Sequence, residues 1–180
     1  MIRELSIPGL KVVTVRIYND DRGFFVERYQ MERFSAYGLP SLVQDNHSRS
    51  KPGVIRGLHY QTNPDQGKLV GVIRGRIWDV AVDLRRDSAH FGKWEAIELN
   101  DSNGQLLWIP SGFAHGFCVL GNESADVLYK VDSVYNPKGE GGIRFDDPDL
   151  KISWPVSSPI VSARDRTMPG FSEYLKNPLF

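Results

Sequence analysis

The chain has 180 residues, of which 41% are hydrophobic and 24% charged, a composition typical of one soluble globular domain that excludes disordered, collagen-like and coiled-coil proteins. Its 22 Lys and Arg residues balance 22 Asp and Glu residues, so no overall field draws it to nucleic acid or to an anionic membrane. An anionic ligand would have to be held by a few local Arg and Lys side chains.

Alternation of apolar and polar residues dominates the chain, and this period is typical of half-buried strands. The segments predicted as strands are 11–18, 24–29, 54–60, 68–74, 76–84, 94–99, 105–109, 114–120 and 126–131. Clusters of Gly, Asn, Asp and Pro between them predict turns, and Arg74-Gly75-Arg76 predicts a tight hairpin. Short antiparallel strands at this spacing favour a sandwich or a barrel, so we predict an all-β fold.

Two short helices are predicted, one over 31–37, closed by Gly38, and one near 171–175. From residue 146 onward prolines are frequent and apolar runs are few, which indicates a strap packed on the barrel rather than a second domain. We therefore predict a single domain over residues 1–180. Its parts are N-terminal strands with a short helix (1–50), a barrel core (51–135) and a C-terminal strap (136–180).

Cys118 is the only cysteine, so we expect no internal disulfide. It lies in the apolar run Phe117-Cys118-Val119-Leu120, which favours a buried, inert thiol over a nucleophile. The first residues lack the apolar stretch of a signal peptide, and no segment reaches the roughly 20 apolar residues of a membrane helix. A cytoplasmic protein is the expectation.

A dense polar stretch, 44–50, precedes the predicted strand 54–60, and taken alone it is compatible with a surface loop. In the strand, His59 shares a face with Ile55 and Gln61, because successive side chains alternate. A single strand histidine is more often structural than functional. If this face lines a barrel, however, a titratable imidazole lies in a cavity.

The spacing of Gly, Pro and His in 104–115 resembles the second conserved motif of the cupins, and 53–61 resembles a degraded form of the first. In metal-binding cupins the first motif reads His-x-His with a Glu a few residues on. Here Gln61 stands at the position of the second His, and Gln66 lies where the acid would be expected. A neutral amide is a poor ligand for a transition metal. We therefore expect no metal, with His59 and His115 converging in a metal-free cavity.

Such a cavity needs other polar groups. Lys68 begins a predicted strand and is either a solvated strand-end lysine or a cation that stabilises an oxyanion. Tyr129 is either a core or rim aromatic or a proton donor. Asp79 and Asp83 share one face of their strand, and a buried carboxylate there needs a partner such as an inward histidine. On composition alone, Asp165 is predicted to be an acid in a surface loop.

Together these blocks resemble the dTDP-4-dehydrorhamnose 3,5-epimerases, the cofactor-independent cupins of dTDP-L-rhamnose synthesis. The segments that carry the resemblance are 21–27, 43–48, 56–61, 68–70, 79–85, 108–117 and 129–130, and the match extends over nearly the whole chain, from Asp21 to Asp165. The resemblance implies a cupin fold, a double-stranded β-helix or jelly-roll barrel with a few short peripheral helices. It also implies no cofactor and a homodimer with strand exchange between subunits, in which Arg22 and Glu27 serve the neighbour's pocket.

The resemblance also implies roles for individual residues. His59 stands at the general base, Asp165 at the acid that pairs with it, and Tyr129 at the general acid on the opposite face of the sugar. The remaining positions that it marks as contacts to the sugar, the nucleotide or the thymine ring are Lys68, His115, Arg22, Glu27, Gln44, Asn46, Arg56, Glu140 and, for thymine stacking, Tyr135. Arg164 stands where some members carry Lys, which keeps the charge but not the geometry.

The substrate implied is dTDP-4-dehydro-6-deoxy-D-glucose, whose C4 ketone acidifies the hydrogens on C3 and C5. A base removes one hydrogen, an enolate forms, and an acid returns a proton to the other face, so two groups of different protonation state must face each other. Other possibilities are a sibling enzyme that inverts only C3 or only C5, a metal-dependent cupin oxygenase, and a non-catalytic cupin that binds a nucleotide or sugar. Retention of His59, Tyr129 and Asp165 together favours an enzyme over a binder.

Overall fold

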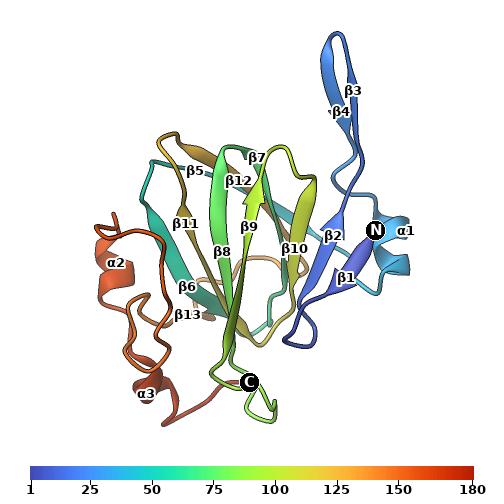
Figure 1. Cartoon of the computed structure of the whole chain (residues 1–180). Helices are drawn as coiled ribbons and strands as arrows, with labels where there is room; N and C mark the ends of the chain where they lie inside the picture. Colours follow the sequence, from blue (N-terminus) through green and yellow to red (C-terminus); the bar gives the residue numbers. More distant parts are fainter.

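The computed structural model describes residues 1–180, and short strands account for most of its regular structure (Figure 1). The strands are β1 (Ile2–Glu4), β2 (Lys11–Thr14), β3 (Ile17–Asp20), β4 (Gly23–Val26), β5 (Gln44–Ser50), β6 (Ile55–Gln61), β7 (Lys68–Arg74), β8 (Arg76–Asp83), β9 (Trp94–Asn100), β10 (Gln105–Ile109), β11 (Phe113–Val119), β12 (Ala125–Val131) and β13 (Glu140–Gly142). The helices are α1 (Met31–Ala36), α2 (Ala163–Arg166) and α3 (Phe171–Tyr174). None of the three helices has the length and apolar character needed to cross a membrane.

Two antiparallel sheets face each other, which confirms the all-β prediction. One sheet has the strand order β1-β2-β10-β7-β12-β5 and the other has the order β13-β6-β11-β8-β9. The hairpin β3–β4 belongs to neither sheet and projects away from the barrel (Figure 1). Strands adjacent in sequence often lie in different sheets, as β10 and β11 do, and this crossing between sheets is the connectivity of a jelly roll.

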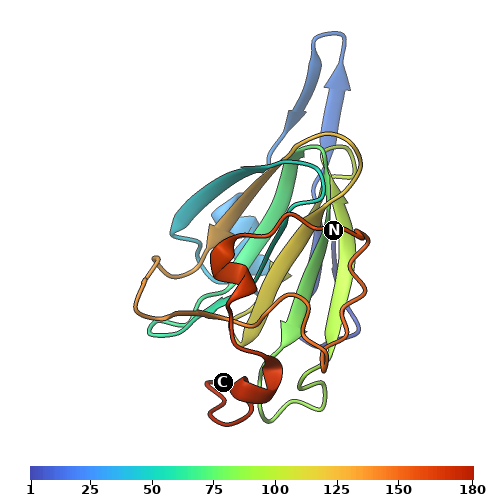
Figure 2. The ribbon, with the colours of Figure 1, turned by 90° about the vertical axis from the view of Figure 1, so that its left-hand side faces the viewer.

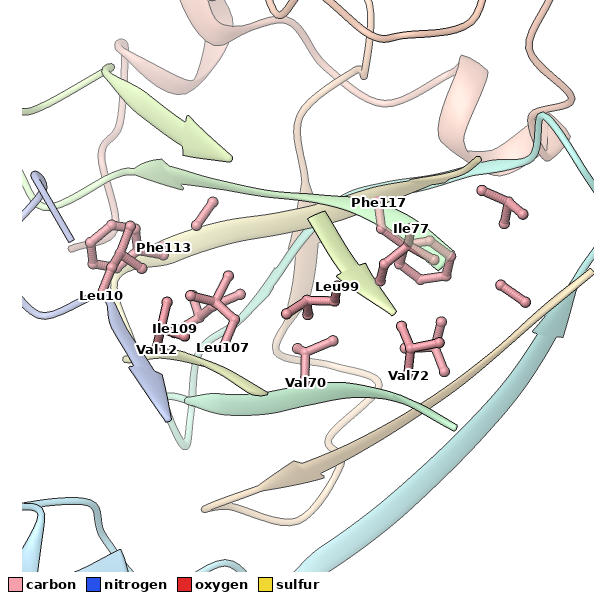
Figure 3. Packing of buried hydrophobic residues seen from close by; sticks show 14 of the residues in the cluster. Leu10, Val12, Val70, Val72, Ile77, Leu99, Leu107, Ile109, Phe113 and Phe117 are labelled. Carbon is pink, nitrogen blue, oxygen red and sulfur yellow. The ribbon is translucent and has the colours of Figure 1, made fainter. Parts of the chain in front are cut away.

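The main hydrophobic core fills the space between the sheets with side chains from β2, β7, β8, β9, β10, β11 and β12 (Figure 3). Val70 and Leu107 come from the six-stranded sheet and meet Ile77 and Leu99 from the five-stranded sheet, all of them almost fully buried. Burying one such side chain stabilises the fold by about 1.5–3 kcal/mol. The core therefore holds the two sheets at a fixed separation, and the polar side chains further along β5, β6, β11 and β12 need not do so.

The segment from residue 146 to the C-terminus covers the outer face of the five-stranded sheet (Figure 2). Leu150, Phe171 and Tyr174 pack there against Val80 and Val82 of β8, whose neighbours in sequence point inward. The Cys118 side chain is buried, and burial raises the pKa of its thiol to about 11, as expected for an inert cysteine. The strap therefore packs on the outer face of the sheet whose strands β6 and β11 line the cavity described below.

The structure departs from the predicted elements at 44–50, at 11–18, which divides into β2 and β3, and at three short elements. The polar stretch 44–50 is strand β5, paired with β12 along its whole length, and not a surface loop. Its exposure alternates, but the inward residues are polar like the outward ones, so no hydrophobic period marks it. The short β1 and β13 and the four-residue helix α2 were not predicted, because elements this short carry no periodic signal.

Candidate active site

A cavity of about 570 Å³ lies between β5 and β12 of one sheet and β6 and β11 of the other, and strap residues 160–165 form a third wall. This volume suits a small-molecule ligand. Most of the residues predicted for the site line it, namely Gln44, Asn46, Arg56, His59, Lys68, His115, Tyr129, Tyr135, Glu140, Arg164 and Asp165. Residues from distant parts of the chain are therefore brought together in one place.

Arg22 and Glu27 lie outside this cavity. Arg22 is at the tip of the projecting β3–β4 hairpin, where its guanidinium binds the Asp20 carboxylate at 2.6 Å (Figure 1). Glu27 follows β4 and pairs with Arg33 at 2.7 Å. Within one chain, neither side chain reaches the cavity.

His59 and Asp165 form a hydrogen-bonded pair in the cavity wall. The Nε2 atom of His59 lies 2.8 Å from Oδ1 of Asp165, whose side chain is only 5% exposed. Asp165 is held in place by α2, where its backbone N–H donates to the side chain of the N-cap Ser162. The prediction of a surface acid from composition is wrong, because a helix of four residues turns this carboxylate inward.

Burial alone would raise the pKa of Asp165, but the hydrogen bond from His59 and the charge of that ring outweigh it, so the pKa lies below its ordinary value. The backbone N–H of Gly57 adds a longer contact of 3.4 Å to Oδ2. Asp165 is therefore an anion at neutral pH. An anion in this position orients the imidazole of His59.

A second pair lies beside the first. His115 on β11 is directly opposite His59 on β6, and its Nε2 atom lies 2.5 Å from Oδ1 of Asp79 on β8. This confirms the prediction that an inward histidine partners an acid of that strand. Asp83, on the same strand, binds Arg85 and Ser88 instead and does not line the cavity.

Lys68 and Tyr129 face these histidines from the other sheet. Lys68 begins β7 and is 8% exposed, and burial lowers the pKa of its ammonium to about 8 although Asp132 and Glu140 counteract this. Tyr129 is on the neighbouring strand β12, and burial, followed by the charge of Glu140, raises the pKa of its hydroxyl. At neutral pH the phenol is protonated and can donate a proton.

A hydrogen-bonded rim surrounds the opening. The Tyr135 hydroxyl donates to Oε2 of Glu140 at 2.7 Å, and Arg164 pairs with the same oxygen at 2.9 Å. Gln44 accepts from the Tyr135 backbone N–H and donates to Asn46, each at 2.9 Å. These bonds join β5, β13 and α2, so one network sets the position of several ligand-facing groups.

The two amides at the metal-ligand positions of the cupin motif serve the loops beside the cavity. Gln61 donates to the carbonyl oxygens of Pro64 and Val134 at 3.0 and 3.1 Å. Gln66 donates to the carbonyl oxygen of Ser133 at 2.8 Å. The structure has no group of three or more His, Cys, Asp or Glu side chains placed to hold a metal ion.

Some residues of the cavity wall were not predicted. Ser48 lines the cavity, and its hydroxyl is buried without a hydrogen-bond partner. It lies two and four residues after Asn46 and Gln44, on the same face of β5. Recognition of 44–50 as a strand would have identified it. Val161 and Ser162 belong to the strap wall, for which the sequence offers no periodic signal.

A base and an acid on facing walls of one cavity can perform acid–base chemistry, and the jelly-roll fold with this cavity is that of an enzyme of the cupin type. The chain belongs to the dTDP-4-dehydrorhamnose 3,5-epimerase family, whose family model matches residues 4–173. The resemblance drawn from the motifs is thereby confirmed.

Relatives are similar to this protein over nearly the whole chain. A dTDP-4-dehydrorhamnose 3,5-epimerase of Pseudomonas aeruginosa is 49% identical over 172 residues, which cover 94% of each protein. The structure of a dTDP-6-deoxy-D-glucose-3,5-epimerase of Legionella pneumophila in complex with dTDP-4-keto-L-rhamnose has a TM-score of 0.91 at 43% identity, over 96% of this chain and 93% of that one. A 3'-monoepimerase of Streptomyces bikiniensis in complex with dTDP-quinovose has a TM-score of 0.88 at 33% identity, over 96% and 88%.

Proposed function

We propose that this chain inverts C3 and C5 of dTDP-4-dehydro-6-deoxy-D-glucose and so forms dTDP-4-dehydro-L-rhamnose for dTDP-L-rhamnose synthesis. The observation that carries this function is the placement of a His–Asp pair and a protonated tyrosine on facing walls of one cavity, His59 with Asp165 on one side and Tyr129 on the other. Inversion requires a proton to leave one face of a carbon and another to arrive at the opposite face. Groups on facing walls meet that requirement.

In this mechanism His59 is the general base. Asp165 binds its Nε2, so Nδ1 is the atom left to take the proton from C3 or C5. The negative charge of Asp165 then favours the imidazolium that forms. Tyr129 delivers a proton to the far face, and the Lys68 ammonium stabilises the negative charge that develops on the C4 oxygen.

Proton transfer by such groups contributes about 10²–10⁴-fold, so stabilisation of the enolate and positioning of the sugar must supply the remainder. Positioning falls to the nucleotide. Tyr135 is half exposed at the rim, where its ring is accessible to the thymine. Arg56 and Arg164 line the cavity and are the cations suited to the diphosphate, because guanidinium groups match phosphate oxygens.

A homodimer is part of the same proposal. The β3–β4 hairpin projects from the barrel and exposes Tyr18, Phe24 and Phe25, each more than half exposed in the single chain. Large exposed aromatic side chains on one element are typical of an interface. Insertion of this hairpin against a second copy would carry Arg22 and Glu27 to the neighbour's cavity.

The direct test is proton NMR of the purified protein with dTDP-4-dehydro-6-deoxy-D-glucose in D₂O. We expect deuterium at both C3 and C5, with inversion at both. Inversion at one carbon alone would assign the chain to the monoepimerases, for which the Streptomyces bikiniensis relative is a structural precedent. Binding without exchange at either carbon would contradict an enzymatic function.

Activity should survive exhaustive chelation. The amides of Gln61 and Gln66 are engaged in hydrogen bonds to backbone carbonyls, and amides are poor ligands for transition metals. The measurement is turnover after prolonged EDTA treatment, with metal analysis of the same sample. Loss of turnover that one added divalent ion restores would contradict the metal-free mechanism.

Arg56→Ala should weaken binding of dTDP more than it slows the chemical step, because a phosphate contact is equal in the ground and transition states. We expect the Kd for dTDP to rise by about tenfold or more, in line with the loss of a charge-assisted hydrogen bond. Arg49→Ala is the matched control, since Arg49 is nearby on β5 but binds Asp126 outside the cavity. Equal Kd values for Arg56→Ala and the unmodified protein would exclude the phosphate role.

A further inference from the structure

Two His–Asp pairs form a row across the five-stranded sheet. The strand order places β6, β11 and β8 side by side, and α2 lies against β6. The row therefore runs Asp165, His59, His115, Asp79. Each imidazole is bound by a carboxylate on its outer side, and the two rings are cross-strand neighbours. Only the first pair has a role in the mechanism described above.

The pair of His115 and Asp79 is the more deeply buried of the two. The side chains of His115 and Asp79 are 10% and 0% exposed, against 29% for His59. Oδ2 of Asp79 is buried and has no hydrogen-bond partner, so the whole carboxylate depends on the one bond from His115. Burying a carboxylate with so few partners costs stability, and such groups are concentrated at functional sites.

The ring of His115 keeps one nitrogen for a ligand. Nε2 is taken by Asp79, whereas Nδ1 makes no hydrogen bond within the chain and is not among the buried atoms that lack a partner. His115 lines the cavity, so Nδ1 is accessible from it. When Nε2–H donates to Asp79, a second proton on Nδ1 makes the ring a hydrogen-bond donor toward the cavity.

We propose that Asp79 is a positioning residue, which fixes the ring of His115 so that Nδ1–H donates a hydrogen bond to the carbonyl oxygen of the keto sugar. This role rests on the proposed function. It places two donors around the oxygen that becomes negative in the enolate, His115 from the five-stranded sheet and Lys68 from the six-stranded sheet. Donors aimed at a developing oxyanion act mainly on the chemical step.

A purely structural role for the pair is not needed to hold these strands together. β8 and β11 are paired over seven consecutive residues of each strand, with Asp79 opposite Phe117 and Ala81 opposite His115. An apolar pair would serve packing at least as well as a buried ion pair. Asp83 shows the structural alternative on the same strand, because Arg85 and Ser88 bind both of its oxygens outside the cavity.

The first experiment compares Asp79→Asn with Asp83→Asn, two isosteric changes of fully buried acids on one strand. We expect kcat of Asp79→Asn to fall by about 10²-fold with little change in KM, the scale of one lost oxyanion donor. Asp83→Asn should lower the melting temperature and leave kcat unchanged. Equal kcat values for the Asp79→Asn variant and the wild type would overturn the proposal.

A double-mutant cycle then asks whether Asp79 acts through His115. If it does, Asp79→Asn added to His115→Asn causes no further loss of kcat, because the interaction is already gone. A second loss of about 10²-fold in the double variant would indicate an independent role and contradict the positioning role. The control cycle replaces Asp79→Asn by Asp83→Asn, for which the two effects on melting temperature should add.

A third measurement needs no turnover and no variant. Long-range ¹H–¹⁵N NMR of the wild-type protein should show His115 with protons on both Nε2 and Nδ1 in the free enzyme. A ring whose Nδ1 carries no proton would overturn the proposal even if Asp79→Asn fails to fold. The same spectrum separates the two levels of inference, because an unreactive wild-type protein would disprove the epimerase function without changing the state of this ring.

Discussion

His59→Asn abolishes deuterium uptake at both C3 and C5 if one base serves both carbons, and this is the largest effect that we expect from a single substitution. The rate should fall by about 10⁴-fold, the upper end of what general acid–base catalysis contributes. Asparagine keeps a polar group near Asp165 but cannot take a proton from carbon. The measurement is the exchange of both hydrogens in D₂O, followed by NMR, on a variant shown to be folded.

His47→Asn is the control for this substitution. His47 also binds a carboxylate through Nε2, that of Asp126 at 3.2 Å, but it lies on the outward face of β5 and does not line the cavity. Its exchange rates should equal those of the wild type. Substantial deuterium uptake at either carbon by folded His59→Asn would show that another group is the base.

Tyr129→Phe should separate proton removal from inversion. Phenylalanine keeps the aromatic volume and loses only the hydroxyl, so packing of the β12 wall should change little. His59 remains in place and the C–H bond can still break. We expect deuterium to enter the substrate with retention of configuration, while formation of the L-configured product falls by about 10²-fold or more, the scale of one general acid.

Each alternative result for Tyr129→Phe has its own meaning. Inversion at a rate near that of the wild type would make Tyr129 a rim aromatic and assign the acid to water or another side chain. Joint loss of exchange and inversion would mean that the hydroxyl is needed for enolate formation itself. Tyr174→Phe is the control, because this buried tyrosine donates to the carbonyl oxygen of Leu84 under the strap, away from the cavity.

Strands of the barrel core could be predicted from the sequence because each has one buried apolar face. β7 and β10 begin and end at the predicted residues, and both place valine or leucine side chains in the core between the sheets. The period-two pattern and the burial have the same cause there. The prediction that His115 lies in a cavity followed from the spacing of Gly, Pro and His in 104–115.

The same reasoning fails where the cavity replaces the core. The inward side chains of β5 line the cavity instead of packing against apolar neighbours, and they are polar. The strand therefore has no hydrophobic face to detect. Asp165 fails for a different reason. Its burial depends on the docking of a helix of four residues onto β6, which is a tertiary event with no local signal. Only the family resemblance marked it as the partner of His59.

The pairing of His59 with Asp165 joins residues 106 positions apart, one on a central barrel strand and the other on the strap. The barrel has its own core between the sheets, whereas α2 is a single helical turn at the surface. Segments of this kind open locally at a lower free energy than the core unfolds. We therefore expect loss of activity on heating to precede loss of the fold, because the lifting of this one turn is sufficient to separate Asp165 from His59.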